Sequence, residues 1–178
     1  SGGGCALNCS HCNKHYIEQM PTLKDRIPSN AKSLLISGGL DKNGKSFIKQ
    51  KYNELLTLKK KGNYRYNSHV GFVEENEIED LKNLVDFISF DFVSDSDVIK
   101  RVYHLEKSVD EYIKLYKLLK SKIQTYPHIT IGLDAGKIHW EYSAIDILNE
   151  IGADRLVLNV LIPTQVTEFE NLNPPDID

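Results

Sequence analysis

The three cysteines of this 178-residue chain lie close together near its start, at Cys5, Cys9 and Cys12. Three thiols cannot all pair as disulfides, and the C-x3-C-x2-C spacing is poorly suited to bridging neighbours. Thiolates are ligands for zinc and for iron–sulfur clusters. With zinc, His11 or His15 could complete a Cys3His tetrahedron. With a four-iron cubane, the three cysteines would hold three corners and leave one iron open. The spacing therefore predicts a metal centre of one of these two kinds.

Other candidate residues follow short apolar runs, where buried parallel strands would end. Ser37-Gly38-Gly39 closes the run 34–36, which has the form of a buried strand. His69, Asp91 and Asp134 fall near the ends of later runs. His69 could contact a substrate or only hydrogen-bond at a strand end, and Asp91 could bind a ligand or only form a turn. Carboxyl ends of parallel strands share one edge, so these residues are expected near the cysteines.

Strand-like and helix-like segments alternate along the chain, which indicates a parallel sheet with right-handed crossovers and helices outside. The expected strands are 33–37, 64–72, 87–93, 128–133 and 155–162, and the expected helices are 13–20, 46–61, 74–84, 97–104, 108–123 and 140–151. Residues 1–4 read as the end of a further strand, and Gly62 as the glycine that follows a helix. The length suits a single domain over 1–178, and we expect further residues to flank it at both ends.

The cysteine segment resembles the cluster loop of the radical S-adenosylmethionine (SAM) superfamily. Ser37-Gly38-Gly39 is similar to the segment that contacts the SAM amino group there, although Leu40 replaces the usual acid. Segments 127–141 and 160–164 resemble the fifth and sixth strands of the biotin synthase-like branch, most closely its small archaeal biotin synthase and lipoyl synthase-like homologues. The resemblance implies an α/β fold, a partial (βα)6 TIM-like barrel whose first strand is largely missing from this chain.

The resemblance also implies two cofactors, a site-differentiated [4Fe-4S] cluster and SAM. Its iron ligands would be the three cysteines, and the open iron would chelate SAM. One electron would then cleave SAM, and the resulting radical would remove hydrogen from an unactivated carbon. The SAM-binding residues implied in this way are His11, Ser37, Gly38, Gly39, Asp91, Gly132 and Asp134. No catalytic residue of the protein itself is assigned.

Within this branch, the specific reaction expected is sulfur insertion of the lipoyl or biotin synthase type in a two-protein system. Such reactions usually consume an auxiliary cluster, and no cysteine follows Cys12. The implied partners are a low-potential electron donor of the ferredoxin or flavodoxin kind, a sister radical SAM subunit and an acyl-carrier protein. The alternatives are a single-cluster rearrangement, cleavage or methylation enzyme, or a zinc-stabilised α/β binding domain.

Composition sets aside two other classes of function. Basic and acidic residues number 22 and 25 and are interspersed, so the net charge of −3 gives no basic footprint for nucleic acid. The run Lys59–Lys61 is expected to be a solvated helix end. No apolar stretch is long enough for a transmembrane helix, and no signal peptide is visible. Thiols grouped for a metal, with none left for disulfides, indicate a reducing cytoplasm.

Overall fold

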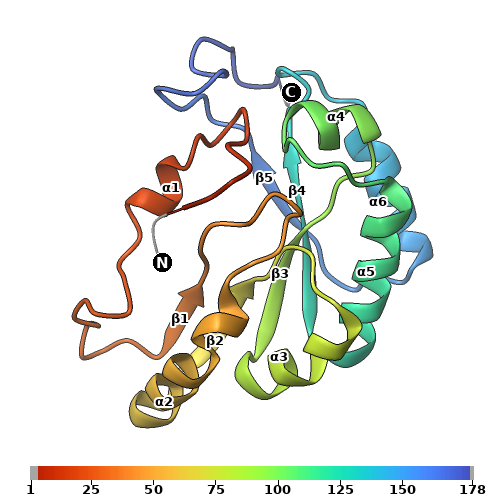
Figure 1. Cartoon of the computed structure of the whole chain (residues 1–178). Helices are drawn as coiled ribbons and strands as arrows, with labels where there is room; N and C mark the ends of the chain where they lie inside the picture. The colour runs from red at the N-terminus through yellow and green to blue at the C-terminus, as the bar shows by residue number, and fades with distance from the viewer. Residues whose placement is uncertain (1–3, 177–178) are drawn as a thin grey trace.

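The computed structural model describes residues 4–176, which form one parallel sheet with helices on its outer side (Figure 1). The strands are β1 (Ser33–Ile36), β2 (Arg65–His69), β3 (Phe87–Asp91), β4 (Thr125–Ile131) and β5 (Val157–Val160). They pair in chain order, β1-β2-β3-β4-β5, and every pair is parallel. Because each crossover steps one strand further in the same direction, the sheet curls into part of a barrel, as predicted.

The helices after β1 cover the convex side of this curl in Figure 1. They are η1 (Ile48–Lys51), α2 (Tyr52–Gly62), η2 (Glu75–Glu77), α3 (Ile78–Leu84), α4 (Ser96–Arg101), α5 (Val109–Lys122) and α6 (Trp140–Glu150), whereas α1 (His15–Glu18) lies near the N-terminus. The capping box before α5 is confirmed, because Ser108 and Glu111 each bond the backbone N–H of the other.

The hydrophobic core lies between the sheet and these helices. Alternate strand residues such as Tyr66, Ile88 and Ile129 point into it and are fully buried. Phe90 of β3 stacks on Tyr116 of α5 with 6.2 Å between ring centroids. Burial of a large apolar side chain contributes about 1.5–3 kcal/mol, so this side of the sheet holds the barrel in shape.

A cluster of side chains, here called the aromatic floor, lies at the amino end of the opposite, inner side of the sheet. It consists of Arg65, Phe87, Tyr126 and Arg155. The Phe87 and Tyr126 rings meet edge to face at 5.6 Å. The guanidinium of Arg65 lies 6.0 Å from the Phe87 ring, and that of Arg155 lies 5.6 Å from the Tyr126 ring. Both distances are within the range of cation–π attraction.

Some expected elements differ in extent. The helix expected at 13–20 is a single turn, α1. The left-handed residue that ends α2 is Asn63 (φ 50°) and not Gly62, which is the last residue of the helix. The strand end expected at 1–4 lies outside the described residues except for Gly4, which is in no strand. Within residues 4–176, no helix has the length and apolar character needed to cross a bilayer.

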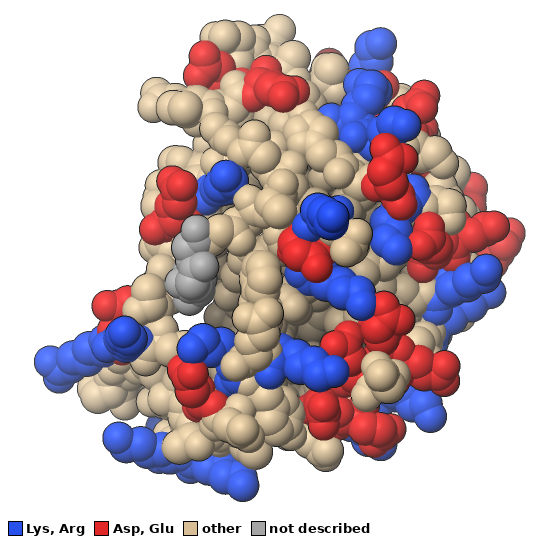
Figure 2. Space-filling model, viewed as in Figure 1, with Lys and Arg blue, Asp and Glu red and all other residues tan. Residues whose placement is uncertain are grey.

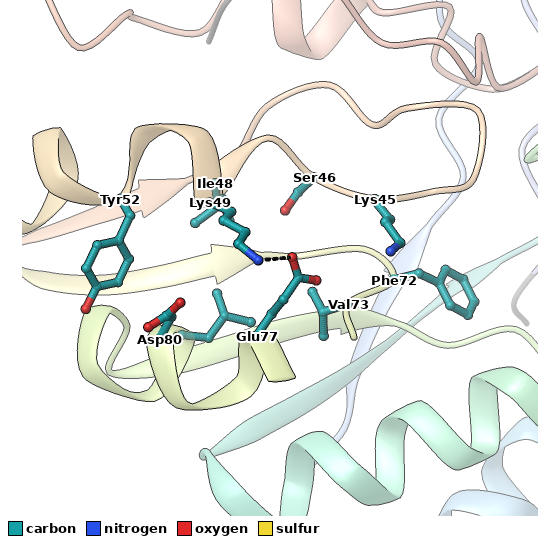
Figure 3. A pocket seen from close by; sticks show the side chains of 10 residues that line it. Lys45, Ser46, Ile48, Lys49, Tyr52, Phe72, Val73, Glu77 and Asp80 are labelled. Carbon is teal, nitrogen blue, oxygen red and sulfur yellow. Dashed lines mark ion pairs between the residues drawn. The ribbon is translucent and has the colours of Figure 1, made fainter. Parts of the chain in front are cut away.

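The molecular surface has no broad patch of one charge on the face shown in Figure 2, where Lys and Arg are interspersed with Asp and Glu. A pocket lies on the outer side between η1 and η2 (Figure 3). Lys49 and Glu77 form an ion pair of 3.3 Å there. None of the residues that line it comes from the cysteine segment, so it is not part of the site described next.

Candidate active site

The cysteine loop, residues 5–12, lies at the carboxyl end of the sheet (Figure 1). Backbone hydrogen bonds hold it to the segments that follow two strands. The N–H of Ala6 donates to the carbonyl of Leu40 after β1 (2.7 Å), and the N–H of Ser10 donates to the carbonyl of Val102 after α4 (2.9 Å). The sheet therefore fixes the path of the loop.

The segment after β5 also forms hydrogen bonds with this loop. The buried hydroxyl of Ser10 donates to the carboxylate of Glu168 at 2.7 Å. The amide of Asn13 donates to the carbonyl of Val166 at 2.7 Å. Residues near the C-terminal end of the described chain therefore help to hold the cysteine loop, which lies near its N-terminal end.

His11 lies inside the loop and packs edge to face against Tyr103, with 5.3 Å between ring centroids. Its Nδ1 atom is buried and has no hydrogen-bond partner among the described residues. Burial lowers the pKa of His11 and so favours the neutral ring. An unpaired buried nitrogen is costly unless a ligand completes it, which fits the SAM contact that the sequence predicts.

The thiols fit a cationic centre. Burial, followed by the neighbouring Cys5 and Cys12, raises the pKa of Cys9 to about 12. Burial also raises the pKa of Cys12. Without a cation these thiols stay protonated, whereas bound metal draws off the protons and compensates the thiolates. The residues present therefore suit an iron–sulfur cluster, for which cysteine is the usual ligand.

Within residues 4–176, no group of three or more His, Cys, Asp and Glu side chains is already arranged around one point as a single metal ion requires. Neither expected histidine joins the thiols. His11 has the unpaired nitrogen described above, and His15 contacts Gln19 at 2.9 Å.

Gly39 of the predicted SAM segment touches the cysteine loop directly. A Cβ atom on Gly39 would lie 2.1 Å from the carbonyl oxygen of Gly4 and 2.7 Å from the nitrogen of Cys5. Only glycine permits this approach of two backbones. Gly38 is different, because a Cβ there would have nothing within 4 Å, and Ser37 precedes both directly after β1. The segment thus adjoins the first cysteine.

Asp91, the last residue of β3, lies beside two histidines. Its Oδ2 is 3.6 Å from Nδ1 of His69, and the ring of His69 meets that of His128 edge to face at 5.3 Å. Partial withdrawal from water raises the pKa of Asp91, although about half of its side chain remains exposed. His69, followed by His128 and His11, outweighs this effect and leaves the pKa below its ordinary value. Burial lowers the pKa of His69, yet Asp91 more than compensates and raises it. Burial lowers the pKa of His128.

Asp134 and Gly132 lie in the loop after β4 and are engaged within the protein. The two oxygens of Asp134 contact Arg101 (2.6 Å) and His139 (2.8 Å). Arg101, then His139, lowers the pKa of Asp134. A Cβ on Gly132, at φ 88°, would lie 2.7 Å from the Pro175 ring. The structure therefore brings the cysteines, His11, Gly39 and Asp91 to one edge and gives Gly132 and Asp134 protein partners.

Sequence reasoning missed His128, Tyr103 and Glu168. The signal for His128 is the alternation of Tyr126, His128 and Thr130 with buried residues along β4, which places polar side chains on the inner face. For Tyr103 and Glu168 the sequence has no comparable signal. Their roles depend on how loops far apart in the chain meet the cysteine loop.

The sequence matches no family model and no curated protein. The fold is similar to the crystal structure of methylornithine synthase (PylB), with a TM-score of 0.70 and 11% identity. The alignment covers 95% of this chain and 54% of that one, so this chain spans about half the length of the matched enzyme. At such identity the comparison concerns the fold. The five parallel strands and outer helices form the partial TIM-like barrel that the sequence predicts.

Proposed function

We propose that this chain is the core of a radical SAM enzyme, with Cys5, Cys9 and Cys12 as ligands of a [4Fe-4S] cluster. The observation that carries the proposal is the placement of all three thiols in one loop at the carboxyl edge of a partial barrel. Barrel folds build their active sites at this edge. The bound cluster and SAM would together supply one-electron cleavage of SAM and a radical that abstracts hydrogen.

The chain's own residues would position these groups and exclude water. The Gly39 backbone supports the start of the cysteine loop, and the unpaired Nδ1 of His11 offers one hydrogen bond to a ligand. Asp91 and His69 present a carboxylate and an imidazole at the same edge. These residues bind and orient ligands, and no step of the reaction is assigned to any of them as acid or base.

For the specific reaction we retain sulfur insertion of the lipoyl or biotin synthase type, which the sequence resemblance supports. Because the chain has no cysteine after Cys12, the sulfur donor would be a cluster on a sister subunit or on further residues. An acyl-carrier protein would present the substrate, and a ferredoxin- or flavodoxin-like protein of the cytoplasm would supply the electron.

A second candidate is a single-cluster reaction, namely rearrangement, cleavage or methylation of a small molecule. The structural neighbour named methylornithine synthase favours it, because that name denotes a small amino acid as product. A single-cluster reaction also requires only the three cysteines of this chain. The two candidates share the cluster and SAM and differ in substrate and in the need for a second cluster.

The test is anaerobic purification and reconstitution, followed by assay of iron, acid-labile sulfide, zinc and 5′-deoxyadenosine. We expect iron and sulfide in equal amounts and SAM-dependent 5′-deoxyadenosine after reduction. Cys12→Ala should lose the cluster absorbance and SAM cleavage, because an iron corner loses its ligand. One zinc ion per protein chain, without acid-labile sulfide, would instead support a zinc-stabilised binding domain. Cleavage of SAM by Cys12→Ala protein would refute the ligand assignment.

A further inference from the structure

The inner face of the sheet carries polar side chains on three neighbouring strands. Parallel sheets covered on both faces are usually apolar on both. Here the alternation that buries Tyr66, Ile88 and Ile129 against the helices turns a polar set toward the interior of the curl. The polar set consists of Asn67, His69, Ser89, Asp91, His128 and Thr130, and register places His69 beside Ser89 and Asp91 beside His128.

Several hydrogen-bonding groups of this polar set have no partner in the described chain. The Ser89 hydroxyl donates to Oδ1 of Asn67 at 3.0 Å, and the Nδ2 donors of Asn67 bond to nothing in residues 4–176. The ring nitrogens of His128 likewise have no hydrogen bond there, although the ring packs against His69. Asp91 Oδ2 lies 3.6 Å from His69, beyond a normal hydrogen bond.

The set remains accessible to solvent at the carboxyl end of the curl. The Asp91 side chain is 48% exposed and the His69 side chain 30% exposed. At the opposite, amino end of this face lies the aromatic floor, because Phe87 and Tyr126 each precede a member of the set by two residues and so share its face. A molecule on this face would therefore have the floor below it and the cysteine loop at its other end.

We propose that the polar set binds the substrate, and that the part of the substrate held there is a small polar group that donates hydrogen bonds to Asp91. Asn67 and His128 complete its hydrogen bonding from neighbouring strands. The inference rests on the proposed function and narrows its substrate class. Donor groups of this kind are amines and hydroxyls.

An unbranched acyl chain does not suit this face. It would displace water from Asn67, Asp91 and His128 without replacing the lost hydrogen bonds, and unpaired polar groups are costly to dehydrate. A polar substrate makes use of the same groups. If sulfur insertion is the reaction, the portion of the substrate between the floor and the cysteine loop is polar and not a bare octanoyl chain.

The experiment is saturation-transfer NMR on the reconstituted protein with SAM bound, titrated separately with L-serine, D-ribose and methyl octanoate. Serine offers an amine, ribose offers only hydroxyls, and methyl octanoate offers an acyl chain with no charge and no hydrogen-bond donor. Two variants test the face. Asp91→Asn removes the charge at constant size, and His128→Phe keeps the ring contact with His69 while removing the ring nitrogens. Asp146→Asn, on the exposed side of α6, is the matched control.

We expect serine or ribose to bind, and whichever binds identifies the donor as amine or hydroxyl. Asp91→Asn and His128→Phe should each weaken that binding by about tenfold, the usual result of losing one hydrogen bond to a charged or buried group. Asp146→Asn should leave it unchanged. Methyl octanoate should not bind.

Three results would overturn the inference: binding of methyl octanoate that either variant alters, binding of a polar probe that neither variant alters, or no binding of either polar probe. SAM affinity is measured in parallel. If Asp91→Asn weakens SAM alone, Asp91 belongs to the SAM site and the inference fails. Polar probes that bind without any formation of 5′-deoxyadenosine would contradict the proposed function and leave only a polar binding site. SAM cleavage together with probe binding that neither variant alters would contradict the inference and not the proposed function.

Discussion

His104 donates a hydrogen bond from Nδ1 to the carbonyl oxygen of Leu7 across 2.8 Å. The carbonyl can only accept, so the proton lies on Nδ1. His104 does this from a left-handed backbone conformation (φ 55°). A residue nearly a hundred positions away thus holds the cysteine loop between its first two cysteines.

Replacement of His104 by alanine should therefore loosen the loop. We expect a loss of about 1–2 kcal/mol in unfolding free energy for the hydrogen bond, measured by urea denaturation. The variant should also lose more of its iron during gel filtration than the unsubstituted protein does. His104→Asn should lose less, because asparagine tolerates the left-handed conformation and keeps a donor. Equal losses in both variants would show that the imidazole, and not the hydrogen bond to Leu7, matters.

Two adjacent glycines provide a matched pair. Gly39→Ala would place Cβ 2.1 Å from the Gly4 carbonyl oxygen, so the backbone before Cys5 must move. Iron content after reconstitution should fall several-fold. Gly38→Ala meets nothing within 4 Å and should keep its iron. The assay is iron and sulfide per protein, and an equal iron content in the two variants would contradict the close contact.

Asp86 makes a pH-dependent contribution to stability. Its Oδ2 accepts from the N–H of Tyr66 at 2.6 Å and from Lys59 at 2.8 Å. Burial raises the pKa of Asp86, but Lys59 and the Tyr66 N–H outweigh it and leave the pKa below 3.8. A lowered pKa in the folded state means that the contribution is full above about pH 4 and is lost as the pH falls further.

Asp86→Asn should then destabilise the protein by about 1–3 kcal/mol at pH 7, as expected for hydrogen bonds to a charged group. The difference from the unsubstituted protein should shrink below pH 4. Chemical denaturation at a series of pH values gives the measurement, with Asp146→Asn as the exposed control. A difference that stays constant down to pH 3 would exclude the ionised carboxylate as its source.

Asp134 is predicted from the sequence to bind SAM, and the structure gives both of its oxygens protein partners. Asp134→Asn should weaken the contacts with Arg101 and His139. Because Arg101 is largely exposed, we expect a fall of no more than about 1 kcal/mol in stability. SAM affinity, measured by calorimetry, should change by less than about twofold if these contacts are its whole role. A larger loss would support the sequence prediction.

The fold could be predicted because its signals are local. The run Leu34–Ile36 before two glycines and the capping box at Ser108 each specify an element within a few residues. All five readable strands exist, and none of their ends is shifted by more than three residues. The expected strand at 128–133 begins at Thr125 instead, because Tyr126 and Pro127 fit the pleat. When the strand is taken to begin at His128, the alternation of Tyr126, His128 and Thr130 is not apparent, and the inward position of His128 is missed.

The environment of the site could be predicted only in part. The cysteine spacing is visible in the sequence, and parallel strand ends bring Gly39 and Asp91 to the same edge. The contacts of Ser10 with Glu168 and of Leu7 with His104 join segments about a hundred or more residues apart. No local propensity specifies such contacts. The expectation that Lys59–Lys61 would be solvated also missed Lys59, which bonds Asp86 and the carbonyl of Leu84.

The last strand has a consequence for how the protein behaves at high concentration. In the described chain β5 pairs only with β4, and all four of its residues, Val157–Val160, are exposed and uncharged. A free strand edge of this kind is a template for pairing with another chain. We expect light scattering to report concentration-dependent self-association of the protein studied by itself, and Leu158→Lys to raise its onset, since a lysine at an edge discourages pairing. We therefore expect the exposed edge of β5, more than the net charge, to determine whether the protein remains monodisperse.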